Sequence, residues 1–144
     1  MNLDNNRLNI LYERVKSPAK ENVVKVVINR GNKILLLRAE DKLWELPGGH
    51  VEDGEDELKA LKREVKEETR LTLELDRLTQ LSQTKSSGKQ ILWYRYHDIG
   101  DKKVKISDEH IDHKWVSVKK LDSYKLSSST NKLAILSSFY ENIK

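Results

Sequence analysis

Three features of the chain point to one domain of mixed α and β structure (α+β), with more strands than helices. Short runs of β-branched and other apolar residues recur and are separated by turn-forming residues, as strands are. A single long segment lacks proline and glycine and carries apolar residues at helical spacing. The chain has 144 residues with no internal repeat or linker, so residues 1–144 are expected to form one domain.

The first expected element is a β-hairpin. Residues 23–28 (VVKVVI) and 33–38 (KILLLR) are apolar runs, and the segment between them, NRGN, is rich in turn formers. The following segment, 43–54 (LWELPGGHVEDG), contains one proline and three glycines. Because proline and glycine interrupt regular structure, this segment is expected to be a loop.

An amphipathic helix is expected next, over residues 55–71. This segment has no proline or glycine, and Leu58, Leu61 and Val65 recur at the spacing of one helix face. Serine and threonine followed by spaced apolar residues predict a closing helix over 127–143. Between the two helices, further strands are expected at 71–83, 90–97, 103–106 and 113–118.

The composition excludes several function classes. The chain has 27 Lys and Arg against 23 Asp and Glu, a net charge of +4. The basic residues are scattered and fall short of a nucleic-acid-binding signature, so a nucleic-acid partner is a lesser expectation. Free nucleotides fit this charge as well as polymers do. Cysteine is absent, so disulfides, thiolate nucleophiles and iron–sulfur clusters are excluded. The four histidines lack the spacing of a zinc site and are expected to be surface or structural residues.

No association with a membrane is expected. The longest uninterrupted apolar run covers residues 34–37, whereas a membrane-spanning helix needs roughly 18 such residues. The start of the chain, MNLDNNRLNILYERV, lacks the basic beginning and apolar middle of a secretory signal. The protein is therefore expected to be cytoplasmic.

Acidic and basic side chains are segregated around the expected helix. On a helical wheel, Glu57, Glu64, Glu67 and Glu68 fall on one arc beside the apolar face, and the lysines and arginines fall on another. Like charges stacked at i and i+4, such as Glu64 and Glu68, cost stability. A hard divalent cation with oxygen ligands, Mg²⁺ or Mn²⁺, would neutralise the acidic arc. The alternative is a charged helix face in contact with water.

The expected loop and helix share a longer motif. Residues 49–55 read GHVEDGE, and residues 63–71 read REVKEETRL. This string resembles the Nudix box of the Nudix hydrolase family (MutT-like), in which glycine, glutamate and a glutamate-rich cluster recur at this spacing. The preceding residues 44–48 (WELPG) are also typical of the family. One position departs from the pattern, because Arg70 stands where the family has glycine.

The resemblance covers about residues 23–121 and implies the Nudix fold, an α/β/α sandwich around a central mixed β-sheet. The box would form a loop–helix–loop catalytic motif that holds metal and pyrophosphate. If the turn that ends the helix needs a positive φ, Arg70 costs about 1 kcal/mol relative to glycine.

The resemblance also implies an activity and its residues. Nudix hydrolases cleave a nucleoside diphosphate linked to another moiety, by attack of water at a pyrophosphate, with Mg²⁺ as cofactor and Mn²⁺ as its substitute. By position, the implied metal ligands are the Gly48 carbonyl oxygen and the carboxylates of Glu64, Glu67 and Glu68. Arg63 can pair with Glu67 at i and i+4 and orient these ligands.

The remaining roles leave alternatives open. Glu109, on a later loop, is a general base, a further metal ligand or a solvated surface acid, and Glu67 or Glu68 is the rival base. Glu55 is either a helix-capping acid or a metal ligand. Trp44 can stack on a base, with core packing as the alternative. The expected catalytic residues are Arg63, Glu67, Glu68 and Glu109, and the expected substrate contacts are Gly48, Gly49 and Trp44.

The leading substrate is a nucleoside triphosphate, an oxidised one included, hydrolysed to the monophosphate and pyrophosphate. The proline typical of ADP-ribose hydrolases and the tyrosine typical of dinucleoside-polyphosphate hydrolases are missing after the box. The alternatives are hydrolysis of ADP-ribose, nucleotide sugars or dinucleoside polyphosphates, removal of an RNA 5′ phosphate or cap, and nucleotide sensing without catalysis. Family members often dimerise, and the sequence is compatible with a homodimer.

Overall fold

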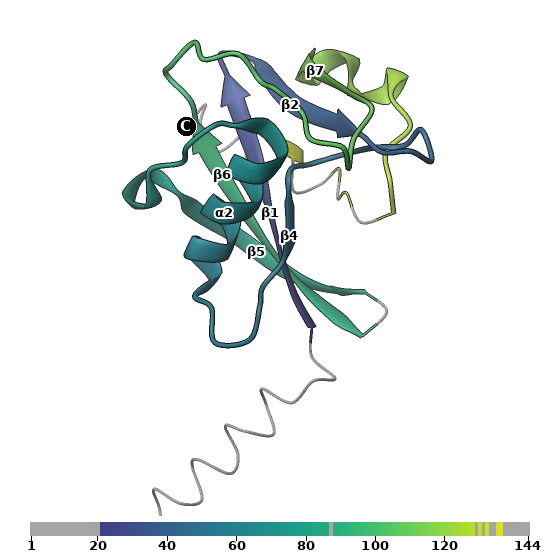
Figure 1. Cartoon of the computed structure of the whole chain (residues 1–144). Helices are drawn as coiled ribbons and strands as arrows, with labels where there is room; N and C mark the ends of the chain where they lie inside the picture. Colours follow the sequence, from purple (N-terminus) through teal and green to yellow (C-terminus); the bar gives the residue numbers. More distant parts are fainter. Residues whose placement is uncertain (1–20, 87, 129, 131, 133–134, 137–144) are drawn as a thin grey trace, which may run out of the picture.

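A central mixed β-sheet organises the chain. The structure, a computed structural model, describes residues 21–86, 88–128, 130, 132 and 135–136 (Figure 1). Helix α2 lies across one face of the sheet in this part of the chain. The expected α+β class and central mixed sheet are therefore confirmed. Most of the expected closing helix, 127–143, lies outside the described residues, although residues 132, 135 and 136 are helical.

The sheet has seven strands. Five follow the order β3-β2-β1-β6-β5, while β4 pairs with β1 and β7 pairs with β2. Strands β1 and β6 are parallel, and the other pairs are antiparallel. The strands are β1 (Glu21–Arg30), β2 (Lys33–Arg38), β3 (Trp44–Glu45), β4 (Gly48–His50), β5 (Thr79–Ser86), β6 (Lys89–His97) and β7 (Asp112–Ser117). The helices are α2 (Glu57–Thr69) and the 3₁₀ helices η1 (Leu75–Arg77) and η2 (Val118–Ser123).

Strand β1 separates two apolar clusters. Its side chains alternate between the two faces of the sheet, as side chains of a strand do. Val24 packs with Leu61 of α2 on one face. Val27 packs with Trp93 and Leu121 on the other face. The mostly apolar run at 23–28 therefore reflects a strand that is buried on both sides.

Helix α2 is shorter by two residues at each end than the expected 55–71. Asp56 is its N-cap, because the Asp56 carboxylate accepts hydrogen bonds from the N–H groups of Leu58 and Lys59 at 3.1 and 3.3 Å. The helix ends at Arg70, which has the left-handed conformation with φ of 69°. Arg70 thus occupies a position where glycine is favoured. Among the described residues, no helix is both long enough and apolar enough to cross a membrane.

The expected loop at 43–54 is corrected, because it contains the short strands β3 and β4. Gly48 has φ of 141° and pairs with Lys25 of β1. A Cβ atom at Gly48 would lie 1.9 Å from the Val24 carbonyl oxygen. Only glycine allows the two backbones to approach so closely. Glycine permits a strand here, whereas we expected it to prevent one.

Two expected strands are also corrected. Within 71–83, strand structure begins only at Thr79, after η1. Residues 103–106 form no strand. Instead, the Lys105 N–H donates to the Thr69 carbonyl at the end of α2, at 3.0 Å, and the neighbouring apolar side chains pack on the core. Their alternation therefore reflects packing at the end of the helix. The hairpin and the strands at 90–97 and 113–118 are confirmed.

Candidate active site

A pocket of about 320 Å³ brings together segments that are far apart in the sequence. Strands β1, β4 and β6, helix α2 and the loop before β7 all contribute to it. Five of the expected site residues line this pocket: Gly48, Gly49, Glu64, Glu68 and Glu109. The other lining residues are Val23, Lys25, His50, Lys89 and Ile91.

Glu68 is the most buried acid of the pocket. The residue is only 5% exposed, and its Oε1 atom accepts a hydrogen bond of 3.0 Å from the Gly48 N–H. Burial raises the pKa of Glu68 to about 7, although the hydrogen bond from Gly48 and the charge of Lys25 act in the opposite direction. The protein's own groups therefore do not supply enough positive charge to offset the effect of burial on the Glu68 carboxylate.

Glu64 lies beside the box glycine Gly49. A Cβ atom at Gly49 would come within 2.4 to 2.7 Å of the Glu64 carboxylate, so any other residue would displace that carboxylate. Burial raises the pKa of Glu64, and Arg63 offsets only part of this effect. Gly48 and Gly49 are therefore needed for two different contacts, one with the backbone of β1 and one with a helix carboxylate.

Arg63 holds several carbonyl and carboxylate groups together. It donates to both oxygens of Glu55 at 2.8 and 2.9 Å, to Glu64 at 3.0 Å and to the His50 carbonyl at 3.1 Å. The expected pairing with Glu67 exists at 3.5 Å and is the longest of these contacts. Arg63 therefore connects the box loop to the helix through Glu55 more than through Glu67.

Glu55 is neither the helix cap nor a residue of the pocket lining. The hydrogen bonds from Arg63 and from the Glu52 N–H lower the pKa of Glu55 to about 2. The capping alternative for Glu55 is thus corrected, because Asp56 is the N-cap. The metal alternative stays a prediction, which the pairing of the Glu55 carboxylate with Arg63 disfavours.

Glu67 and Trp44 lie outside the pocket lining. The Glu67 side chain is 59% exposed and contacts Arg63, which places it on the outer side of the acidic helix face. Trp44 is 6% exposed and packs in an apolar cluster, where its ring meets Tyr124 edge to face. This position agrees with the packing alternative for Trp44, and its contact with substrate stays a prediction.

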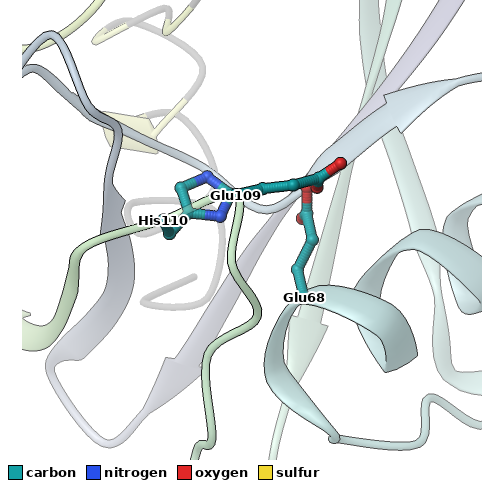
Figure 2. A group of neighbouring side chains, drawn as sticks. All are labelled: Glu68, Glu109 and His110. Atoms are coloured by element: carbon teal, nitrogen blue, oxygen red, sulfur yellow. The ribbon is translucent and has the colours of Figure 1, made fainter.

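Glu109 lies close to Glu68 and to a neighbour that the sequence did not single out. Glu68, Glu109 and His110 each have one atom able to bind a metal, and these three atoms lie within 4.8 Å of one another. Figure 2 shows the three side chains converging. His110 Nε2 lies 2.7 Å from the Glu45 carboxylate. The loop before β7 thus delivers both an exposed acid and a buried imidazole to the site.

Lys25 is a second residue that sequence reasoning missed. It is buried in β1, lines the pocket, and donates from Nζ to the Leu46 carbonyl at 3.1 Å. The sequence did contain an indication that Lys25 is special, because it is the single charged residue in the otherwise apolar run 23–28. A lysine is almost never buried without a partner or a role.

The donor set of the pocket fits a hard divalent cation. Glu64 and Glu68 both have pKa values raised by burial, so their charged forms need a cation that the chain does not supply in full. Carboxylate and carbonyl oxygens are the ligands that Mg²⁺ and Mn²⁺ prefer. The residues that could hold the metal are Glu64, Glu68, the Gly48 carbonyl and, from outside the pocket lining, Glu67.

Comparisons with known proteins agree on one family. The NUDIX domain family model matches residues 19–135. The nucleoside triphosphatase NudI of Escherichia coli is 32% identical in a 127-residue alignment that covers 76% of this chain and 90% of that protein. A MutT NUDIX hydrolase from Burkholderia pseudomallei superposes with a TM-score of 0.70 at 25% identity, covering 82% of this chain and 97% of that one. A MutT protein from Methanosarcina mazei Go1 gives a TM-score of 0.66 at 26% identity, covering 87% and 96%.

Proposed function

We propose that this chain, a pyrophosphohydrolase that belongs to the Nudix family, hydrolyses a nucleoside triphosphate to the monophosphate and pyrophosphate. The observation that carries the proposal is that Glu64 and Glu68 line the same pocket as Lys25 and Lys89. Carboxylates for a metal and ammonium groups for phosphate oxygens are thus present side by side. The similarity to a nucleoside triphosphatase over most of both chains supports this substrate class.

The cofactor in this proposal is Mg²⁺, with Mn²⁺ as its substitute. Glu64, Glu68, the Gly48 carbonyl and Glu67 would hold it. When bound, such an ion neutralises charge on the phosphate oxygens and makes a bound water more acidic. Arg63 acts as a positioning residue, because it fixes the Glu64 carboxylate through a 3.0 Å hydrogen bond.

The chain's own groups supply substrate binding and proton transfer. Lys25 uses one of its three donors on the Leu46 carbonyl, which leaves two for phosphate oxygens. Lys89 lies at the start of β6 and lines the same pocket. Glu109, an exposed carboxylate at the pocket, accepts the proton of the attacking water.

The test is a product assay over a substrate panel with Mg²⁺. The panel contains nucleoside triphosphates, oxidised nucleoside triphosphates, ADP-ribose, a nucleotide sugar, a dinucleoside polyphosphate and 5′-triphosphorylated and capped RNA. The products are separated by ion-exchange chromatography, which also detects the monophosphates formed from ADP-ribose, nucleotide sugars and dinucleoside polyphosphates. For the triphosphates, phosphate is measured with and without added inorganic pyrophosphatase, so that release of pyrophosphate is distinguished from release of phosphate. We expect pyrophosphate from a triphosphate and loss of that activity in Glu68→Gln.

Glu57→Gln is the matched control, because Glu57 lies on the same helix and does not line the pocket. It should keep activity within about twofold, as surface substitutions away from a site do. Preference for ADP-ribose, a nucleotide sugar, a dinucleoside polyphosphate or RNA would overturn the proposed substrate, and salt-sensitive binding would mark the RNA case. Nucleotide binding without turnover would instead indicate a sensing module. Homodimerisation stays a prediction, which sedimentation of the full chain would test.

A further inference from the structure

His110 is a buried residue with one ring nitrogen unaccounted for. Its side chain is only 3% exposed, and its Nε2 atom lies 2.7 Å from a Glu45 carboxylate oxygen. Its Nδ1 atom is buried and has no hydrogen-bond partner. Among the described residues, only Asn22 Oδ1 shares this condition. Buried polar atoms without a partner are rare, so Nδ1 calls for an explanation.

The contact with Glu45 determines which nitrogen is available. A carboxylate accepts hydrogen bonds and cannot donate them, so His110 donates its Nε2 proton to Glu45. Burial lowers the pKa of His110, but the hydrogen bond with Glu45 and the charge of Glu68 raise it overall. A metal ion at Nδ1 would therefore displace a proton and bind the lone pair that the neutral ring carries there. A histidine that binds metal through one nitrogen usually donates from the other to a carboxylate. The Glu45–His110 pair has this arrangement before any metal is considered.

The imidazole of His110 lies at an acidic cluster. A ring nitrogen of His110 and one carboxylate oxygen each of Glu68 and Glu109 lie within 4.8 Å of one another, and Figure 2 shows the imidazole beside both acids. Ligand atoms that share an ion at about 2.1 Å are roughly 3 to 4 Å apart. The cluster therefore needs only small side-chain adjustments to share one ion.

The local charge also suits a divalent cation. Glu45, Glu68 and Glu109 supply three carboxyl groups, and Lys25 and His110 are the basic groups that act on Glu45 and Glu68. The carboxyl groups outnumber the basic groups, and the raised pKa of Glu68 shows that its charged form lacks a sufficient positive partner. Arg63 does not correct this imbalance, because its hydrogen bonds go to Glu55, Glu64 and the His50 carbonyl.

We propose that Nδ1 of His110, together with the carboxylates of Glu68 and Glu109, binds a divalent transition-metal ion, so that the site selects Mn²⁺ over Mg²⁺. Imidazole binds transition metals better than it binds Mg²⁺, which prefers oxygen ligands and retains its water. This inference rests on the proposed function, because it concerns the metal of the same pocket, and it makes Mn²⁺ the preferred ion and Mg²⁺ the substitute. One oxygen of Glu109 would bind the metal, and the other would remain to accept the proton of the attacking water.

The test is pulsed electron paramagnetic resonance of Mn²⁺ bound to the untagged full chain. An imidazole ligand produces a ¹⁴N modulation of the Mn²⁺ signal, which oxygen ligands do not. We expect this modulation in the wild-type protein and in a variant with His50, His97 and His113 all changed to Gln, in which His110 is the last histidine. We expect its loss in His110→Gln, together with at least about a tenfold loss of Mn²⁺ affinity measured against Mg²⁺ competition.

Three outcomes would overturn the inference. The first is a wild-type Mn²⁺ signal without nitrogen modulation, which would also be the result if Nδ1 carries a proton. The second is modulation that disappears in the triple variant, which would assign the nitrogen to another histidine, such as His50 of the pocket lining. The third is modulation that persists in His110→Gln. The wild-type and triple-variant spectra do not require His110→Gln to fold.

The same experiment separates this inference from the proposed substrate. Nitrogen modulation from His110 combined with no turnover of any nucleoside triphosphate would leave the metal assignment standing and overturn the substrate. Turnover of a triphosphate without nitrogen modulation would do the reverse.

Discussion

The acids around helix α2 lie in two contrasting surroundings. In the first, which we call the arginine clamp, Arg63 donates to Glu55 at 2.8 and 2.9 Å and to Glu64 at 3.0 Å. In the second, the pocket floor, Glu68 receives one hydrogen bond, from the Gly48 N–H. The pKa of Glu55 is lowered to about 2, mainly by Arg63, whereas burial raises the pKa of Glu68 to about 7.

This contrast separates structural acids from acids that are available for chemistry. In the clamp, an internal cation favours the charged form, so the carboxylates stabilise the fold. On the pocket floor, the fold buries a carboxylate without a matching cation, which costs stability. Strongly perturbed acids in a pocket are characteristic of functional sites. The pocket floor is therefore the region that an external cation would stabilise.

Replacing one acid from each region should change the melting temperature in opposite directions and lower turnover to very different extents. This is the largest difference we expect. Glu68→Gln should lower turnover at least about 100-fold, which corresponds to about 3 kcal/mol of lost transition-state stabilisation. It should also raise the melting temperature of the metal-free protein at pH 8, because a neutral amide is cheaper to bury than a carboxylate. Steady-state kinetics and thermal unfolding in EDTA measure the two effects.

Glu55→Gln is the matched variant from the clamp. It should lower turnover by less than about tenfold and should lower the melting temperature, because Arg63 loses its main ionic partner. Similar kinetic losses in the two variants would remove the distinction between the regions.

The pH dependence of stability offers a second way to separate the pocket floor. Folded protein holds the Glu68 proton with a pKa of about 7, against the ordinary value of 4.5. Folding therefore favours the protonated acid, and this contribution is present at low pH and is lost as pH rises through 7. Relative to Glu68→Gln, metal-free wild-type protein should lose up to about 3 kcal/mol of unfolding free energy between pH 4.5 and 8.

Urea unfolding in EDTA at several pH values measures this difference. Saturating Mg²⁺ should reduce the loss, because a ligand that binds only the folded state adds stability. A difference between wild type and Glu68→Gln that does not vary with pH would show that Glu68 titrates normally.

The two regions also differ in how far the sequence revealed them. The acidic helix and the box loop are local in sequence, so helical periodicity and motif spacing predicted Glu64 and Glu68 of the pocket. The pairing of Arg63 with Glu67 follows from the helix repeat and was also expected. Its stronger pairing with Glu55, eight residues away, depends on how the loop enters the helix, which periodicity does not describe.

Contacts between distant segments were not predictable in the same way. His110 meets Glu45 across 65 positions, and Lys25 meets the Leu46 carbonyl across 21. Such contacts follow from strand order and register, on which a local pattern carries no information. Strand β4 was missed for a related reason, because the glycine that suggested a loop is the residue that lets β4 approach β1.

Removing the clamp itself should have an intermediate effect. Arg63→Ala should lower the unfolding free energy by about 2 kcal/mol at pH 7, because charge-assisted hydrogen bonds to Glu55 and Glu64 are lost together. Arg63→Lys should recover only part of this loss, because lysine cannot form the two-pronged contact with Glu55. Urea unfolding of the three proteins at pH 7 gives the comparison.

The clamp also predicts an acid dependence with the opposite sign to that of the pocket floor. Glu55 has a lowered pKa, so its contribution is present above the ordinary value of 4.5 and is lost as pH falls toward about 2. The gap between wild type and Arg63→Ala should therefore narrow with acidification. A gap that stays constant down to pH 2 would mean that Arg63 stabilises the fold by packing and not by charge.

The smallest expected effect concerns Arg70, which lies at the end of the helix that carries both regions. Its φ of 69° is unfavourable for a side chain with a Cβ atom. Arg70→Gly should raise the unfolding free energy by about 0.5 to 1 kcal/mol, because the relief of strain exceeds the added flexibility of the unfolded chain. Arg70→Ala is the control, since alanine removes the charge and keeps the strain. Equal stabilisation by both variants in urea unfolding would identify the arginine charge as the cause.

Turnover should not change in either variant, because Arg70 is exposed and outside the pocket lining. The departure from the box glycine would then affect the stability of the helix end and leave the acids of the pocket floor in place.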